Sequence, residues 1–332
     1  MTAINALPQQ LTTSSGRGYA AKLALAFAAI YLLWGSTYLA IRYSVETIPP
    51  LLTAGIRFSI AGSILFAWAW TRGFRPKREH WMAGAIVGAL LFLGSHGMLY
   101  WAEQTVASGQ AALLIATEPM FILIFGWMAG QQKISRLSAL GLGFGLVGVG
   151  LITGVEHATS SSLLGLAAVL LASSSWAAGV VISPRVRLPA DALARTAIPL
   201  LCGAVMLLIA AGVTGEIQRT QWSAISLRSV LGLGYLITFG SVVAFTAYMW
   251  LLQRCPPTLV ATHAYANPVV AILLGWLFAS EQVGARVLLA SAAILGAIVL
   301  IRQGERRVAT PTPTPAALPT GANRGKEQAL AG

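Results

Sequence analysis

The hydrophobic positions of this chain fall into long runs separated by short polar stretches. Ten runs of about 20 residues are long enough to cross a hydrocarbon core of about 30 Å. They lie near residues 20–40, 51–71, 81–101, 108–129, 137–155, 162–182, 195–213, 229–252, 258–279 and 284–302. Backbone groups in hydrocarbon must be satisfied within their own segment, so each run predicts a transmembrane helix. The pattern therefore predicts an all-α integral membrane protein with ten transmembrane helices.

Two stretches of the chain are copies of one unit. WAEQTVASGQAALLIATEPMFILIFGW begins at Trp101, and WLLQRCPPTLVATHAYANPVVAILLGW begins at Trp250. At a constant offset of 149, identical residues pair as Trp101 with Trp250, Gln104 with Gln253, Ala112 with Ala261, Pro119 with Pro268, Gly126 with Gly275 and Trp127 with Trp276. A weaker match aligns Trp34 with Trp176 at an offset of 142. Internal duplication in an apolar chain is typical of transporters built from repeats.

The duplication divides the ten spans five and five, with the boundary near residues 156–162. We therefore expect a cytoplasmic N-terminal segment (1–19), a first five-helix repeat (20–155), a second five-helix repeat (162–302) and a disordered cytoplasmic tail (303–332). Because each copy has an odd number of spans, the second copy enters the membrane upside down. A solute pathway is then expected between two inverted repeats, with alternating access as they exchange roles.

Composition and charge agree with a membrane protein. Hydrophobic residues make up 56% of the chain and charged residues only 10%, whereas a soluble domain has about a quarter of its residues charged. The net charge of +12 invites a nucleic-acid function, but its distribution predicts no nucleic-acid partner. Of the 22 Lys and Arg, 17 fall on the side of the termini, four fall opposite (Arg42, Arg219, Arg228 and Arg286), and Arg57 lies within a span. By the positive-inside rule both termini are expected in the cytoplasm.

The cysteines and the two ends of the chain add little chemistry. Cys202 and Cys255 show neither disulfide nor metal spacing, and we expect them to pack. The first 19 residues lack a cleavage pattern, so no removable signal peptide is expected. The Pro-rich tail from Ala309 is expected to be extended and solvated.

Several motifs together resemble the drug/metabolite transporter superfamily, in its EamA-type branch. They are WGSTYLAIR in the first span, the Arg57-Phe58 pair, TEPMFILIFGW in the fourth span and ANPVVAILLGWLFASEQ in the second copy, which includes Glu281. The resemblance covers about residues 20–302, and one departure is Gln132 at the position equivalent to Glu281. Within the branch the chain is similar to the YddG type of exporter, which is associated with aromatic and other amino acids. The resemblance implies a multi-pass protein of the bacterial cytoplasmic (inner) membrane.

The chain carries no recognisable catalytic or nucleotide-hydrolysing motif. There is no GxxxxGK[ST], HExxH, GxSxG or CxxC, and no carboxylate cluster suited to a metal. We therefore expect no enzyme activity and no cofactor or metal. Transport is expected to run on a gradient of solute, proton or ion.

Two ionisable residues inside spans are candidates for function, because each costs about 2.5–3.5 kcal/mol at the bilayer centre. Glu118 lies near the middle of the fourth span, and Arg57 lies six residues into the second, about 9 Å below the outer surface at 1.5 Å per residue. One interpretation makes Arg57 an anchor for a carboxylate and Glu118 a proton or amine site. The other makes them a structural pair, or lets Glu118 satisfy backbone donors around a kink at Pro119.

Aromatic and polar side chains recur on the inner helices at helical spacing. They suit an amphipathic solute through stacking and cation–π contact, although some, such as Trp101, also fit an interfacial belt. The predicted cavity lining comprises Trp34, Tyr38, Arg57, His96, Tyr100, Trp101, Glu118, Trp176, Tyr248, His263, Tyr265 and Asn267. Pro119 and Pro268 are predicted hinges or kinks. Gly141, Gly145 and Gly148 are expected to bring helices close, within the protomer or across a homodimer.

These observations leave three functions open. The first is a secondary exporter of small metabolites, chiefly amino acids including aromatic ones. The second is a passive facilitator or channel for amphipathic metabolites. The third, a non-transporting membrane scaffold or receptor, is disfavoured because it needs neither deep polar side chains nor an inverted repeat. The expected partners are the lipid bilayer and a small-molecule substrate.

Overall fold

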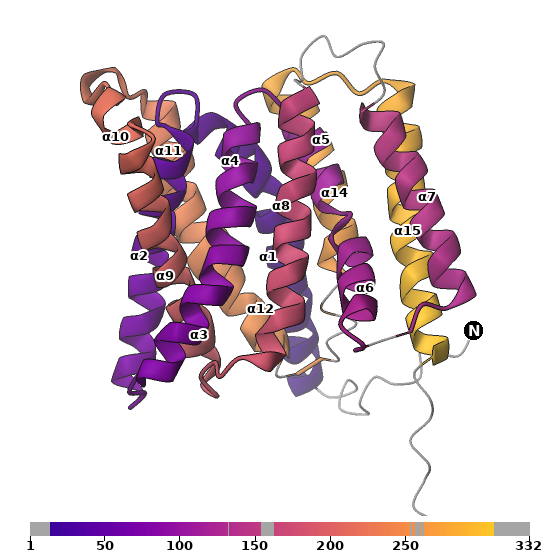
Figure 1. The fold of residues 1–332 in the computed structure, drawn as a ribbon, viewed down its shortest axis with the longest axis horizontal. Coiled ribbons are helices and arrows are strands. Elements are labelled where there is room, and N and C mark those ends of the chain that lie inside the picture. Colours follow the sequence, from indigo (N-terminus) through magenta and orange to yellow (C-terminus); the bar gives the residue numbers. More distant parts are fainter. Residues whose placement is uncertain are drawn as a thin grey trace, which may run out of the picture.

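The computed structural model describes residues 14–131, 133–153, 163–252, 254–255, 260 and 262–308. The predictions for Gln132, for the repeat boundary and for the tail from Ala309 fall outside these residues. All regular secondary structure within them is helical, as the sequence predicts (Figure 1). The first half contains α1 (Ser14–Ser44), α2 (Pro50–Thr71), α3 (Arg78–Gly88), η2 (Ala89–Gly97), α4 (Met98–Ala102), α5 (Ser108–Ile115), α6 (Glu118–Met128) and α7 (Arg136–Thr153). The second half contains α8 (Leu163–Ile182), η4 (Ser183–Arg185), α9 (Ala192–Val213), α10 (Glu216–Arg219), η5 (Trp222–Ala224), α11 (Leu227–Tyr235), η6 (Leu236–Val243), α12 (Ala244–Leu252), α14 (His263–Ala279) and α15 (Ala285–Val308).

These helices give the ten spans predicted from hydropathy. Eight described stretches are long and apolar enough to cross a membrane, and two shorter apolar helices, within α7 and α14, complete the set. Several spans are composite: α3, η2 and α4 form the third, α5 and α6 the fourth, and α11, η6 and α12 the eighth. α15 continues to Val308, past the predicted end of the last span at residue 302.

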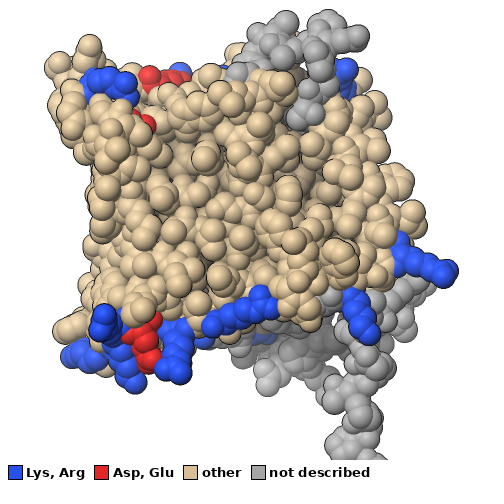
Figure 2. Space-filling model, in the orientation of Figure 1, with Lys and Arg blue, Asp and Glu red and all other residues tan. Residues whose placement is uncertain are grey.

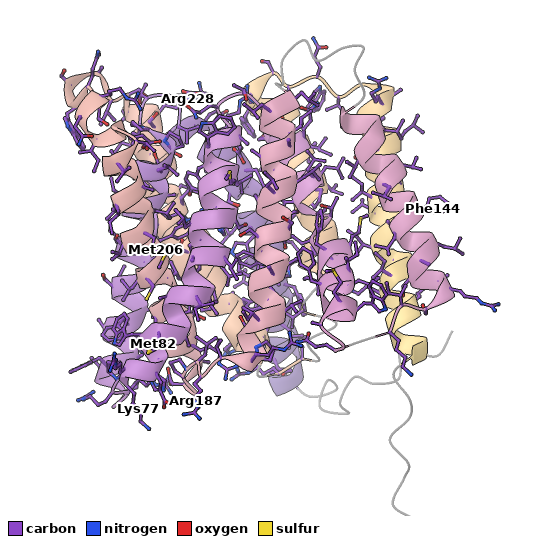
Figure 3. All side chains as sticks on the ribbon, viewed as in Figure 1. Lys77, Met82, Phe144, Arg187, Met206 and Arg228 are labelled. Carbon is purple, nitrogen blue, oxygen red and sulfur yellow. The ribbon has the colours of Figure 1, made fainter. Side chains whose placement is uncertain are left out.

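The first helices of the two halves run in opposite directions. Lys77, between α2 and α3, and Arg187, after α8, lie on one face of the bundle, whereas Arg228 lies on the other (Figure 3). We call these the basic face and the far face. α2 and α8 therefore both end at the basic face, so α1 crosses away from it and α8 crosses toward it. The two five-helix repeats are inverted relative to each other.

The first helix of each repeat packs against helices of the other repeat. α1 packs against η6, α12 and α14 of the second repeat, and α8 packs reciprocally against η2, α4, α5 and α6 of the first. The second spans pair as α2 with α9, and the fifth spans pair as α7 with α15. Each repeat thus places its first helix against the third and fourth spans of the other, as a pseudo-two-fold axis in the membrane plane requires.

Glycines let the fifth spans approach closely, and they do so within the protomer. A Cβ atom at Gly141 would lie 2.8 Å from the carbonyl oxygen of Ala297 on α15. At Gly148 it would lie 2.5 Å from the Ile294 side chain. By contrast, a Cβ at Gly143 or Gly150 would meet nothing within 4 Å. The small residues therefore mark one face of α7, as small-xxx-small packing predicts.

The outer surface of the bundle is suited to lipid. Large apolar side chains such as Leu25 (73% exposed), Val213 (82%) and Met128 (70%) face outward. Figure 2 shows a broad uncharged band between two edges where charged side chains gather, with many of the Lys and Arg along the basic face. The lipid-facing band and the charged edges agree with a multi-pass membrane protein.

Candidate functional site

Arg57 forms the polar centre of the bundle. Its side chain, on α2, is buried, and the residue is only 5% exposed. Nε donates to Ser241 Oγ at 3.0 Å, and Nη1 donates to Tyr100 Oη at 2.9 Å. Ser241 belongs to η6 of the second repeat, and Tyr100 belongs to α4 of the first. Arg57 therefore lies where the two repeats meet.

The charge of Arg57 is not neutralised by a carboxylate. Among the described residues, no Asp or Glu lies within ion-pair distance of it; the ion pairs formed elsewhere include Arg42–Glu281, Arg187–Glu79 and Arg228–Glu46. The structural pairing of Arg57 with Glu118 that the sequence left open is not formed. An unpaired buried charge costs several kcal/mol, and two neutral hydroxyls offset only part of it. An anionic group bound here would complete the site.

His96 and Trp176 form an aromatic group beside Arg57. The His96 ring lies 4.9 Å from the Phe58 ring, 5.6 Å from Phe92 and 5.5 Å from Trp176, measured between centroids. Its Nδ1 is 2.9 Å from the Leu91 carbonyl. The Arg57 guanidinium also lies 5.0 Å from the Phe58 ring. Trp176 comes from α8, so both repeats contribute rings to this group.

A second aromatic group lies on the α1 side of the bundle. The Trp34 ring lies 5.1 Å from Tyr248 and 4.8 Å from His263, and its Nε1 donates to the Gly240 carbonyl at 3.1 Å. Gly240 precedes Ser241, so η6 holds both this group and the Arg57 contact. The predicted residues Trp34, Tyr248 and His263 are thus brought together.

Two π-helical segments, η2 and η6, position these groups. They occupy equivalent places in the third and eighth spans. π-helical turns free carbonyls from the regular ladder and recur at functional sites. In η2, Leu90 O accepts from Ser175 Oγ at 2.8 Å; in η6, Gly240 O accepts from Trp34. Hydropathy does not distinguish π from α turns, so the sequence did not predict these segments.

Glu118 lies at the start of α6, where the fourth span breaks. Pro119 has no N–H, which leaves the Ile115 carbonyl without its helical donor. Ser173 Oγ on α8 lies 3.2 Å from both the Leu114 and Ile115 carbonyls. The predicted break at Pro119 is therefore present and is stabilised by the other repeat. Glu118 is partly accessible and lies within electrostatic range of Tyr38.

The remaining predicted residues lie differently. Trp101 is 39% exposed, as an interfacial residue would be. Pro268 is inside the continuous helix α14, so it does not break its span where Pro119 does. Asn267 Oδ1 is buried without a hydrogen-bond partner among the described atoms. Tyr265 belongs to α14, but its side chain lies outside the described part of the structure.

The far face carries a charged contact that the sequence reasoning missed. We call Arg42, Glu281 and the first turn of α5 the far-face clamp. Glu281 Oε1 accepts from Ser108 N at 2.8 Å and Oε2 from Gly109 N at 3.0 Å, while Arg42 Nη1 lies 3.4 Å from Oε1. A carboxylate at a helix N-terminus satisfies free N–H groups and the helix dipole. The clamp joins α1 and α5 of the first repeat to the second repeat.

Local backbone geometry brings Glu281 to the clamp. Ser280 ends α14 with φ 53°, in the left-handed region that non-glycine residues seldom adopt. A cavity of about 370 Å³ adjoins the clamp and is lined by Arg42, Gln110, Glu281 and neighbouring residues. This cavity lies on the far face rather than at the predicted aromatic lining. In the sequence, Glu281 is recognisable only as part of the family pattern, and nothing there indicates that both of its oxygens accept backbone N–H groups of α5.

The fold and the site define a multi-pass membrane protein built from two inverted repeats around a buried polar centre. The chain belongs to the EamA-like transporter family, whose model matches residues 21–154 and again residues 163–303. It is 39% identical over 283 residues to the Escherichia coli inner membrane transporter YedA, covering 84% of this chain and 90% of that one. The Bacillus subtilis transporter YoaV is 29% identical over 283 residues, covering 84% and 94%. A solved structure titled "Crystal structure of protein" matches with a TM-score of 0.59 at 22% identity, covering 88% of this chain and 99% of that one, which supports the fold.

Proposed function

We propose that this transporter is a secondary exporter of small metabolites, chiefly amino acids including aromatic ones, working by alternating access between the repeats. The observation that carries the proposal is Arg57: a buried guanidinium at the repeat interface, without a carboxylate partner among the described residues. Guanidinium groups bind carboxylates through paired, charge-assisted hydrogen bonds. An amino-acid carboxylate supplies the missing negative charge.

The groups around Arg57 suit the rest of an amino acid. His96 and Trp176 offer ring faces for an apolar or aromatic side chain. Trp34 and Tyr248 offer rings for cation–π contact with an ammonium group. Glu118, partly accessible at the break in the fourth span, is a candidate to bind the amine or a proton.

The far-face clamp supports alternating access, because it holds helices of both repeats together at one surface. The basic face carries most of the Lys and Arg, so we place that face and both termini in the cytoplasm. The protein then closes its outer side in the present conformation. Solute released by opening the clamp would leave the cell.

The test uses purified protein in proteoliposomes, a panel of amino acids and counterflow as the readout. We expect counterflow of aromatic amino acids, and its loss in Arg57→Ala with folded yield unchanged. Removing one partner of a buried charge pair costs about 2–5 kcal/mol, so uptake should fall about 30-fold or more. The matched control is Arg72→Ala on the exposed basic face, which should transport normally.

The outcomes separate the candidate functions. Accumulation against a gradient supports a coupled exporter, whereas equilibration alone supports a passive facilitator. No flux of any solute in the panel, with protein shown to be folded, would contradict amino-acid transport and revive the scaffold interpretation. Equal loss of folded yield and transport in Arg57→Ala would support a structural role for Arg57.

A further inference from the structure

Glu103 is a buried carboxyl group that the site described above does not use. It follows α4 directly, between the third and fourth spans, and is 1% exposed. Among the described residues neither of its carboxyl oxygens has a hydrogen-bond partner, and the same holds for the buried hydroxyl of Ser108 at the start of α5. A buried ionised carboxylate without hydrogen bonds is strongly disfavoured, because nothing replaces its lost hydration.

The charged groups beside Glu103 do not neutralise it. Arg42 contacts Glu281, and both Glu281 oxygens already accept backbone N–H groups of α5. Two carboxyl groups therefore share one guanidinium, whose side chain is 35% exposed. Burial raises the pKa of Glu103 well above its usual range, the Glu281 carboxylate raises it further, and Arg42 opposes them.

Among the other elements around α4, α2 supplies one cation, Arg57, which donates to Tyr100 Oη and not to Glu103. α1 carries Tyr38, α4 itself carries Tyr100, and η2 carries His96. α5 and α8 have no titratable side chain. The closed far face therefore favours a neutral, protonated Glu103.

The equivalent positions of the inverted repeat carry no carboxylate. At the offsets that relate the repeats, Arg42 corresponds to Pro184, Glu103 to Leu252 and Glu281 to Gln132. All three equivalents are neutral, and Arg185, next to Pro184, donates to the Ala129 carbonyl at 2.7 Å rather than to a carboxylate. The two carboxyl groups are thus a feature of the far face, where a cavity of about 370 Å³ is lined by Arg42, Glu281 and neighbouring residues.

We propose that Glu103 is a proton-binding site of this transporter, occupied while the far-face clamp is closed and emptied when the clamp opens. On opening, the O–H bond of the carboxylic acid breaks, the proton passes to water in the far-face cavity, and the carboxylate becomes hydrated. Closing reverses the step and takes up one proton. This inference rests on the proposed alternating access, and it names the proton as the ligand that biases it.

The sign of the pH dependence follows from linkage. A hydrated Glu has a pKa of about 4.3, and the closed state holds Glu103 above that value. Closure is therefore fully favoured below the open-state pKa and is lost as pH rises toward and through the closed-state pKa. Between the two values, the open-to-closed ratio should rise about tenfold per pH unit.

The experiment measures opening directly and needs no substrate. Ser108→Cys is placed in a Cys202→Ser/Cys255→Ser background, because Ser108 is fully buried within the clamp and its hydroxyl has no hydrogen-bond partner among the described residues. An impermeant maleimide is added from the far face between about pH 5 and pH 8. The labelling rate is divided by that of Gln221→Cys, an exposed position on the same face, which cancels the intrinsic pH dependence of the thiol.

We expect the normalised rate to rise with pH when Glu103 is present, and to stay low and flat in Glu103→Gln, which keeps the shape of the protonated form. Glu46→Gln, an exposed carboxyl change on the far face, should keep the wild-type profile. If the normalised labelling rate does not change with pH while Glu103 is present, the proposal is overturned, and no Glu103 variant is needed for that conclusion. A profile retained in Glu103→Gln, or abolished by Glu118→Gln instead, also overturns it. Failure of amino-acid counterflow alone would contradict the proposed substrate but leave this pH profile standing.

Discussion

Glu281→Gln should release the far-face clamp. The carboxylate accepts two backbone N–H groups, at 2.8 and 3.0 Å, and contacts Arg42 at 3.4 Å. The glutamine side chain keeps one acceptor oxygen for a backbone N–H of α5. Its NH2 group faces the other backbone N–H, so that hydrogen bond is lost together with the negative charge. An unmade buried hydrogen bond costs about 1–3 kcal/mol, and loss of a charge at a helix N-terminus costs about 0.3–1 kcal/mol, or up to about 2 kcal/mol when partly buried.

The sum, about 1–5 kcal/mol, corresponds to a shift of about 10- to 5,000-fold toward the open state. The assay is labelling of Ser108→Cys at one fixed pH, compared with the same reporter carrying intact Glu281. Glu46→Gln is the matched control, because the Glu46–Arg228 pair is exposed, at 38% and 52% for the two side chains. An exposed pair is worth about 0–1 kcal/mol, so labelling should change by less than about fivefold. Equal labelling of the two variants would refute the clamp.

Two further predictions concern packing. Ser173→Ala should lower the melting temperature of the detergent-solubilised protein, because the Ile115 carbonyl loses its donor, at a cost of about 1–3 kcal/mol, whereas the Leu114 carbonyl keeps the Thr117 N–H and Oγ1 donors. Ser174→Ala, whose hydroxyl donates to Leu171 of its own helix, is the control. Gly141→Ala should destabilise the α7–α15 pair, since its Cβ would lie 2.8 Å from a backbone oxygen, whereas Gly143→Ala meets nothing within 4 Å and should be neutral or slightly stabilising. A larger loss in either control variant than in its partner would contradict the assigned contact.

The parts of the fold that hydropathy controls were predictable. Lipid requires long apolar helices, so the ten spans follow from run length, and the repeat follows from matched residues such as Trp101 and Trp250. The inversion follows from the odd number of spans. The packing of α1 on the second repeat and of α8 on the first is a tertiary property that no local pattern specifies.

The candidate site was predictable only in part. Arg57 and Tyr100 are each recognisable as candidates from the sequence, but the hydrogen bond between them, and the partner Ser241 on the other repeat, are seen only in the fold. Glu103 and Glu281 fall in short connections, where charged residues are usually solvated, so neither suggested a buried group. The one available signal for Glu103 was its place directly after the apolar run that ends with Trp101 and Ala102.

The division of the α1 stripe also required the structure. Helical spacing placed Trp34, Tyr38 and Arg42 on one face. In the fold, Trp34 contacts Tyr248 and His263, while Arg42 contacts Glu281 at the far face. One stripe therefore serves two different places along the axis of the bundle.

The central claim is that an amino acid binds at Arg57, between the repeats. The most direct test is photo-crosslinking of a diazirine analogue of phenylalanine to the purified protein in proteoliposomes, with the modified residues identified by mass spectrometry. We predict labels on α2, η2, α8 and η6 around Arg57, competed by unlabelled phenylalanine and absent in Arg57→Ala. Labels confined to the far-face cavity beside Glu281 or to the lipid-facing surface, or labels that Arg57→Ala leaves unchanged, would contradict the account.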